Sequence, residues 1–180
     1  MSQSESVSVD ALPKSIDAFC ALRDEIAHTP QGGAAMMVFA LLVHVDDETL
    51  GRQCLTMAVD RGRLQEGEGG YQNLRLARRA QSRIDQQLAA QPYLPRAYIR
   101  GAAPENGYQL PDPPYVIEFA HNPHGGDQAS GRIKVFVVCS GAASPRPVTV
   151  CRNSHGVWKA DEWSSLVMGI IPVAGLEDDL

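Results

Sequence analysis

Residues 132–140, RIKVFVVCS, constrain the fold more than any other segment. In the middle of this run, apolar residues occupy both the odd and the even positions, which point to opposite faces of a strand. A strand with one exposed face alternates apolar and polar residues, whereas a strand covered on both faces is apolar at successive positions. We therefore expect residues 132–140 to form a central strand that is buried on both faces. The rest of the chain would then cover this strand or extend its sheet.

An antiparallel meander is expected around the central strand. Apolar residues alternate with period two over residues 115–121, and the glycine-rich residues 121–131 then form a long hairpin loop. After the central strand, the chain turns back into residues 148–152. The remaining expected segments are a tight reversal at residues 153–156 and closing strands at residues 157–159 and 163–171.

The register of these strands decides where two of the cysteines lie. A turn centred on Ser144 places Val137 opposite Cys151 and Cys139 opposite Thr149. Cys139 and Cys151 would then be diagonal neighbours with Cβ atoms about 7 Å apart, which is too far for a disulfide. We predict that this pair stays reduced.

All four cysteines are expected to be reduced, which bears on the compartment. None has C-x-x-C spacing, and each lies in an otherwise apolar segment. The start of the chain is polar, lacks Lys and Arg, and is not followed by the apolar run of a signal peptide. We therefore predict a cytoplasmic protein. The cysteines are Cys20, Cys54, Cys139 and Cys151.

Four helices are predicted before residue 91. The first opens near Pro13, whose missing N–H is tolerated in a first turn, and residues 28–33 end it with two glycines. The second, residues 34–45, is apolar all round, so it should be the innermost helix. A membrane span needs ~20 apolar residues and this run has about a dozen, so no membrane partner is expected.

The other two helices flank a charged loop. The third covers residues 48–59, with Asp46 or Asp47 as its cap, and residues 60–70 form an exposed loop. The fourth covers residues 73–90 and carries four arginines on its outer face. That face could hold phosphate or an acidic partner, although a solvated face is the more ordinary interpretation. The arginines are Arg75, Arg78, Arg79 and Arg83.

These segments predict an α+β fold in which N-terminal helices pack on a C-terminal curved antiparallel β-meander. A chain of 180 residues is near the usual size of one domain. We expect residues 1–11 to be disordered, residues 12–91 to form a helical half and residues 97–171 to form a sheet half. The net charge of −5 gives no whole-protein attraction to nucleic acid, so we do not expect nucleic acid as a partner.

Two resemblances support this outline. Residues 156–166, GVWKADEWSSL, are similar to the closing strands of nuclear-transport-factor-2-like cone proteins, which implies a fold and little about function. Residues 101–108 (GAAPENGY), 140–147 (SGAASPRP) and 158–170 together resemble an uncharacterised bacterial domain family of unknown function. This second resemblance covers about residue 97 to the C terminus, and it implies no assigned active site.

Catalytic and metal sites have weak support in the sequence. His121, His124 and Asp127 lie on a glycine-rich loop, which is not the rigid support that a metal site needs, so no metal is expected. His44 beside Asp46 and Asp47 could be a general base with a carboxylate partner, or simply the end of a buried helix. No phosphate-binding loop or nucleophile motif is present, so no cofactor and no catalytic residue are assigned.

We predict a non-catalytic binding module for an unknown protein or small ligand, with a homodimer left open. The ligand would bind on the concave side of the sheet and along the connection before residue 115. The alternative is a small cone-fold enzyme in which His44 or His121 acts as a base in a pocket between helices and sheet. The candidate binding residues are Tyr98, Arg100, Asn106, Tyr108, Trp158 and Trp163.

Overall fold

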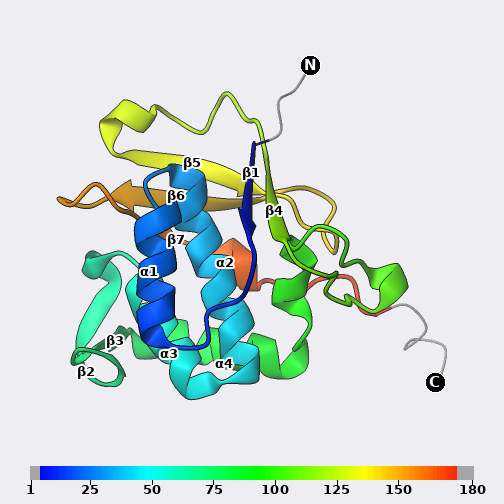
Figure 1. Cartoon of the computed structure of the whole chain (residues 1–180), viewed down its shortest axis with the longest axis horizontal. Coiled ribbons are helices and arrows are strands. Elements are labelled where there is room, and N and C mark those ends of the chain that lie inside the picture. The colour runs from blue at the N-terminus through cyan, green and yellow to red at the C-terminus, as the bar shows by residue number, and fades with distance from the viewer. Residues whose placement is uncertain (1–4, 174–180) are drawn as a thin grey trace.

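The computed structural model describes residues 5–173 and shows a five-stranded sheet covered on one face by helices (Figure 1). The strand order is β1-β4-β5-β6-β7, and every neighbouring pair is antiparallel. The α+β prediction is therefore confirmed. The strands are β1 (Glu5–Val9), β4 (Tyr115–Ala120), β5 (Arg132–Val137), β6 (Arg146–Arg152) and β7 (Trp158–Glu162). The helices are α1 (Ile16–Ile26), α2 (Pro30–Asp46), α3 (Glu48–Ala58) and α4 (Arg78–Ala90), with a hairpin of β2 (Leu64–Tyr71) and β3 (Leu74–Leu76) between α3 and α4.

Helix α2 is the innermost helix, as predicted, and nearly all of its residues are buried. It begins at Pro30 rather than after the glycines, because the Thr29 side chain accepts a hydrogen bond from the Gly32 N–H at 3.0 Å. The expectation that residues 28–33 only end the first helix is therefore wrong. Gly33 serves close packing, since a Cβ there would lie 2.7 Å from the Trp158 carbonyl oxygen.

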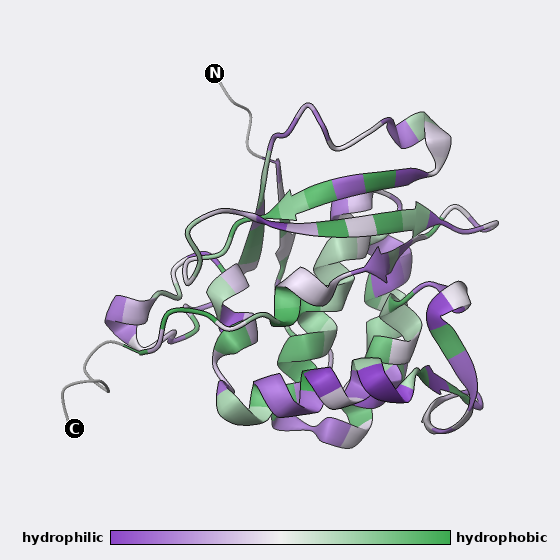
Figure 2. Ribbon diagram, turned by 180° about the vertical axis from the view of Figure 1, so that it is seen from behind, coloured by the Kyte–Doolittle hydropathy of each residue, from purple (hydrophilic) through white to green (hydrophobic). Residues whose placement is uncertain are grey.

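Strand β5 is central in the sheet, as predicted, but it is buried on one face only. Val135 and Val137 are buried in the core, whereas Lys134 is exposed and Phe136 is half-buried. Figure 2 shows the same alternation of hydrophilic and hydrophobic residues along β5 and β6. The prediction of burial on both faces is wrong because helices cover only the inner face.

The predicted register between β5 and β6 is also wrong. Val137 pairs with Arg146 rather than Cys151, and Val135 pairs with Val148. The chain leaves the β5–β6 ladder after Val137, where the Val138 N–H donates to the Glu118 carbonyl and the Ser140 N–H to the Ala97 carbonyl. The turn is therefore centred between Gly141 and Ala142 rather than on Ser144. The cysteine prediction holds nevertheless, since all four are free thiols.

Strand β1 corrects the expectation of a disordered terminus. Residues 5–9 form an edge strand in which Val7 pairs with Ile117 and Val9 is buried. Ser and Val alternate with period two in this segment, but the run is too short to predict a strand by itself. Residues 1–4, which belonged to the same prediction, lie outside the described residues.

The segment between α3 and α4 is more regular than predicted. Asp47 caps α3 by accepting a hydrogen bond from the Leu50 N–H at 3.0 Å, as expected. Residues 60–70, however, are not an irregular loop, because most of them form β2. Arg75 lies on β3 and α4 begins at Arg78, so the four arginines do not share one helix face.

The ends of two other elements differ from their predictions. Helix α1 begins at Ile16, and Ser15 rather than Pro13 marks its start by accepting from the Ala18 N–H. Strand β7 includes part of the predicted closing strand, but a short 3-10 helix, Ser164–Val167, follows it. Within residues 5–173, no helix is long and apolar enough to cross a membrane.

Candidate functional site

Two of the predicted binding residues hold the chain's own C-terminal segment, residues 166–171, which we call the strap. The Tyr98 hydroxyl donates to the Leu166 carbonyl at 2.6 Å, and the Tyr108 hydroxyl donates to the Ile171 carbonyl. Both tyrosines are buried, with exposed fractions of 1% and 0%. Their polar groups are therefore used inside the fold.

Arg146 and Gln91 complete the contacts around the strap. Arg146 is buried and donates to the carbonyl oxygens of Met168 and Gly169, each at 2.7 Å. Gln91 both donates to the Ile170 carbonyl and accepts from the Ile170 N–H, each at 2.9 Å. The strap, whose first two residues end the 3-10 helix, thus lies in a groove whose side chains satisfy its main-chain groups.

Burial also keeps the two tyrosines protonated. It is the largest cause that raises the pKa of Tyr108 to about 12, and it raises the pKa of Tyr98 as well. Both phenols therefore stay hydrogen-bond donors at neutral pH. The Tyr108 ring also stacks on Tyr93, with ring centroids 5.1 Å apart.

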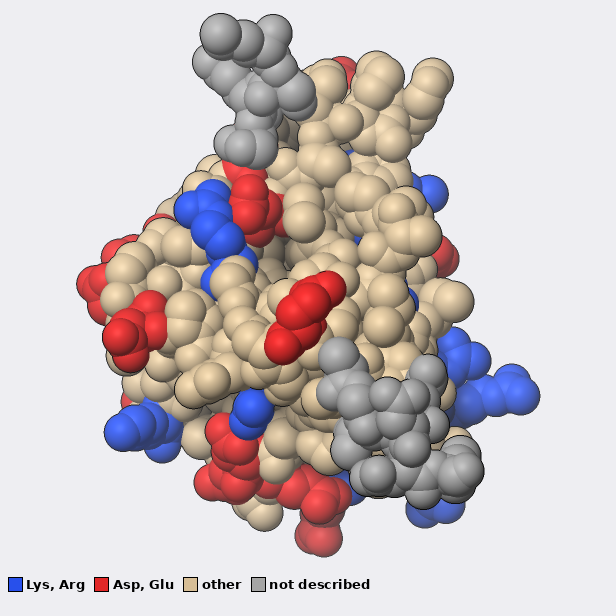
Figure 3. Space-filling model, turned by 90° about the vertical axis from the view of Figure 1, so that its right-hand side faces the viewer, with Lys and Arg blue, Asp and Glu red and all other residues tan. Residues whose placement is uncertain are grey.

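The predicted binding residues Arg100 and Asn106 lie at the surface. Arg100 is exposed and pairs with Glu118 at 2.8 Å. Asn106 accepts from the Ala103 N–H and donates to the Gly101 carbonyl, so it stabilises a turn. Figure 3 shows the side of the molecule that carries β4, where basic and acidic side chains are scattered among many uncharged residues. A ligand role for Arg100 and Asn106 stays a prediction.

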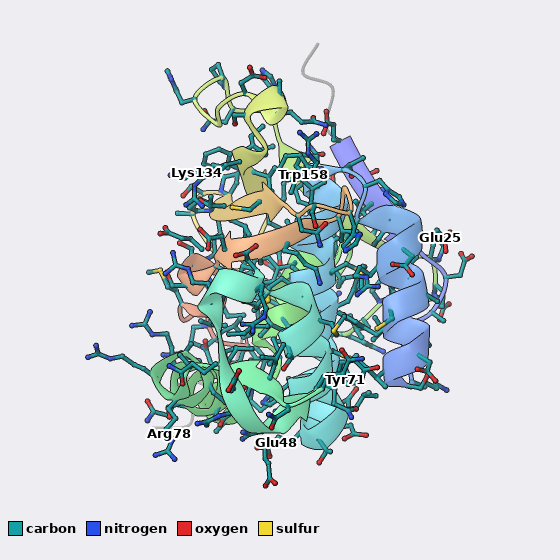
Figure 4. The ribbon with its side chains drawn as sticks, turned by 90° about the vertical axis from the view of Figure 1, so that its left-hand side faces the viewer. Glu25, Glu48, Tyr71, Arg78, Lys134 and Trp158 are labelled. Carbon is teal, nitrogen blue, oxygen red and sulfur yellow. The ribbon has the colours of Figure 1, made fainter. Side chains whose placement is uncertain are left out.

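Trp158 lies in the core, between the sheet and α2 (Figure 4). Its exposed fraction is 1%, and the Arg152 guanidinium carbon lies 5.5 Å from its ring centroid. This distance fits a cation–π contact. The indole therefore contributes to the packing of the sheet edge.

Trp163, the last predicted binding residue, lines a cavity beside α4 that we call the α4 cleft. Its volume is about 450 Å³. Strand β3, the first turns of α4 and the chain after β7 bring its walls together. The apolar lining residues are Val59, Leu76, Ala77, Ala80 and Trp163, and the polar ones are Arg63, Arg79, Arg83, Asp161, Glu162 and Ser164.

The acidic wall of the α4 cleft is already paired. Asp161, whose side chain is 10% exposed, accepts from Arg63 at 2.9 Å and from Arg132. Burial alone would raise the pKa of Asp161, but the two guanidinium groups outweigh burial and hold that pKa below its usual value. Asp161 is therefore ionised and neutralised within the protein.

The basic wall of the cleft has no such partners. Arg79 and Arg83 form no salt bridge and no side-chain hydrogen bond with any residue in the range 5–173, and Figure 2 shows a hydrophilic outer side of α4. Ala77 supplies no side-chain cap to α4, so the N–H groups of its first turn are left for other acceptors. Unused donors thus gather at one end of the cleft.

His44 has a carboxylate partner, although not one of its neighbours in sequence. Its Nε2 atom lies 3.1 Å from Asp85, and Asp85 also accepts from Arg52 at 3.0 Å and from Gln81 at 2.9 Å. Arg52 pairs with Glu48 as well, so the two carboxylates beside His44 share one guanidinium partner. They are less available to a metal ion for that reason.

The alternative of an enzyme with a His base also needs a pocket at the imidazole. His44 is 6% exposed and lines neither the α4 cleft nor four other cavities of the described part of the chain. His121 does line a cavity, of about 340 Å³, but it is exposed and forms no salt bridge with a described residue. Neither histidine thus combines a place in one of these cavities with a carboxylate partner among the described residues.

Sequence reasoning missed Arg63 and Asp161. Their pairing joins residues that are 98 positions apart, so no local spacing could have indicated it. Arg79 and Arg83 were found by their helical spacing, and Trp163 by its residue type. What the sequence did not show is that these three side chains line one cavity.

Comparisons with known proteins give a family and nothing about activity. A family model described as a domain of unknown function (DUF6935) matches residues 11–174, a longer span than the resemblance from residue 97 onward. No curated protein and no solved structure matches the chain. The uncharacterised family is thus confirmed, and any function must be argued from the site.

Proposed function

Because the chain belongs to the DUF6935 family, whose description names no activity, we propose a function from the geometry of the α4 cleft. The protein is a non-catalytic binding module that takes a small anionic ligand in this cleft. The ligand has a flat apolar body that packs against Trp163 and a carboxylate or phosphate group that pairs with arginine.

The observation that carries this proposal is the pair of guanidinium groups of Arg79 and Arg83 at the edge of an apolar cavity. Neither group pairs with a carboxylate among the described residues, while Arg63 in the same cleft is paired with Asp161. Arginine forms bidentate hydrogen bonds with carboxylate and phosphate, so the unpaired groups are suited to an anion from outside the chain.

The size of the cleft supports a small ligand. Ligand pockets usually span about 300–1,000 Å³ and combine an apolar lining with a few polar groups, and this cleft of about 450 Å³ has both. The inner face of the sheet, where we expected binding, is packed against α2. The α4 cleft therefore replaces it in the proposal.

The proposal keeps the bacterial origin and the cytoplasmic location expected from the sequence. The four free thiols support a reducing compartment. A bacterial cytoplasm also contains many small carboxylates and phosphate esters, which are the ligand chemistry proposed here.

Titration with 1-naphthyl phosphate and with its neutral analogue 1-naphthol tests this function. Quenching of tryptophan fluorescence reports binding near Trp163. We expect the phosphate ester to bind more tightly than naphthol. The double substitution R79Q/R83Q should lower only the affinity for the ester, by at least about tenfold, because charge-assisted hydrogen bonds are lost.

Arg78 offers a matched control. It is the neighbouring residue, it extends into solvent in Figure 4, and it is not part of the cleft lining. R78Q should leave the affinity for naphthyl phosphate unchanged. Equal losses in R78Q and R79Q/R83Q, or equal affinities for the ester and naphthol, would show that the cleft does not select anions.

A further inference from the structure

A second cavity lies where α1, the end of α3, the β2–β3 hairpin and β7 come together. Its volume is about 590 Å³, and its lining includes Met57, Leu64, Leu74 and Lys159. Figure 4 views this side of the molecule, with α1 and Tyr71 of β2 in front. Val59 lines both this cavity and the α4 cleft, so the two cavities share one wall.

The amine of Lys159 lines this cavity, and no carboxylate of the described residues pairs with it. Lys159 is half-buried and forms no salt bridge with any described residue, and its Nζ atom donates to the main-chain carbonyl of Met57. A carbonyl can accept a hydrogen bond from an ammonium or, more weakly, from a neutral amine, because both carry N–H groups. The contact therefore positions the amine without requiring its charge.

Other charged and titratable groups face Lys159 from each element packed around it. Burial is the main cause that lowers the pKa of Lys159 to about 8, and the positive charge of Arg23 lowers it further, whereas Cys20, Asp60 and Asp24 oppose the shift. About one amine in ten is then neutral at pH 7, far more than for a solvated lysine. The groups are Cys20, Arg23 and Asp24 on α1, Asp60 and Arg61 after α3, Tyr71 on β2 and His155 before β7.

We propose that Lys159 is a nucleophile that forms an imine with a small aldehyde or ketone bound in this cavity. The lone pair of Nζ attacks the carbonyl carbon, a C–N bond forms, and the carbonyl π bond becomes a hydroxyl after proton transfer. Loss of water from this carbinolamine, with loss of the remaining proton from nitrogen, gives the imine. Amine and carbonyl compound thus become imine and water, and no oxidant or reductant is involved.

The cavity supports this chemistry in two ways. Its apolar residues Met57, Leu64 and Leu74 form part of the wall, and the half-buried position of Lys159 favours a neutral amine. Its volume accommodates a small carbonyl compound beside Nζ. The inference concerns a different cavity from the proposed anion site, so either can fail without the other.

Reductive trapping on the full chain tests the inference, because the sequence has only three lysines, Lys14, Lys134 and Lys159. The protein is incubated with propionaldehyde and cyanoborohydride, and peptide mapping follows the adduct at each lysine. We expect Lys159 to react at least about tenfold faster than the other two at pH 7.5. Mapping also separates it from the terminal α-amine, whose ordinary pKa is near 8.

The pH dependence distinguishes a nucleophile from a merely accessible lysine. The rate at Lys159 should level off above pH about 8, whereas the rate of an ordinary solvated lysine keeps rising toward pH about 10. Equal rates at the three lysines, or a rate at Lys159 that keeps rising to pH 10, would overturn the inference.

Variants then locate the reaction. K159R should abolish the fast adduct and leave the adducts at Lys14 and Lys134, while K134R should keep the fast adduct. If K159R fails to fold, K159Q replaces it, and the mapping on the unmodified sequence stands without either variant. R79Q/R83Q should leave the rate at Lys159 unchanged, which keeps this test separate from that of the α4 cleft.

Discussion

The groove around the strap and the α4 cleft use the same residue types for opposite purposes. In the groove, Tyr98, Tyr108 and Arg146 each donate to main-chain carbonyls of the chain itself. In the cleft, Arg79 and Arg83 find no acceptor in residues 5–173. The comparison shows that an aromatic residue beside an arginine indicates a binding site only where the fold leaves the donors unused.

Burial explains why the strap groove is structural. A buried charge needs partners for its N–H groups, and Arg146 receives them from Met168 and Gly169 rather than from a carboxylate. The Tyr98 hydroxyl accepts a further hydrogen bond from Arg146 at 3.1 Å and donates its own to the Leu166 carbonyl. These contacts join the start of β6 to the strap and tie the end of the described chain to the sheet.

The largest expected effect comes from removing the charged side chain of the groove. R146M keeps most of the side-chain volume but leaves two strap carbonyls without donors, so we expect a loss of about 2–4 kcal/mol in the free energy of unfolding. Urea denaturation measures this loss. R78M removes an exposed arginine and should change stability by less than about 0.5 kcal/mol.

The comparison would break if R146M were as stable as R78M, because the strap contacts would then contribute nothing. The contrast between groove and cleft would become clearer if R146M kept its affinity for naphthyl phosphate. In that case the arginine of the groove supports only the fold, while those of the cleft support only binding.

A smaller effect is expected at the paired wall of the cleft. Asp161 has a depressed pKa in the folded protein, so it contributes stability above its unfolded pKa of about 4 and loses that contribution as the pH falls through the lower folded value. D161N should therefore be less stable by about 1–2 kcal/mol at pH 7. The gap should close once the pH lies below the folded pKa.

Denaturation curves of D161N and the unmodified protein at several pH values check this prediction. A gap that stayed constant down to acidic pH would mean that the contacts of Asp161 with Arg63 and Arg132 do not depend on its charge. D47N is no suitable control, since Asp47 caps α3. D112N serves instead, because Asp112 is exposed and forms no salt bridge within the described residues.

Local patterns predicted the parts of the fold that depend on neighbours in sequence. The apolar run in α2, the cap at Asp47 and the reversal at residues 153–156 all follow from residues within one or two turns of each other. The central place of β5 also followed from its apolar content. These features need no information about distant segments.

The features that failed depend on contacts between distant segments. The register of β6 could not be predicted, because β5 leaves it early to bond Ala97 and Glu118. The partner of His44 is Asp85, 41 positions away, rather than the adjacent aspartates. The tyrosines were recognised as candidates, but their use depends on a strap that lies 63 and 68 positions further along the chain.

The smallest expected effect is on the stability of the cleft variant, and it decides the comparison. If Arg79 and Arg83 do not stabilise the fold, the free energy of unfolding of R79Q/R83Q should lie within about 0.5 kcal/mol of that of the unmodified protein. Exposed side chains without partners contribute little to stability. Removing two like charges on adjacent turns of one helix should even stabilise slightly, because like charges at this spacing repel. We expect such a gain at low salt only, since salt screens the repulsion. Urea denaturation at low and high salt measures it, and a loss above about 1 kcal/mol would mean that these arginines serve the fold as Arg146 does.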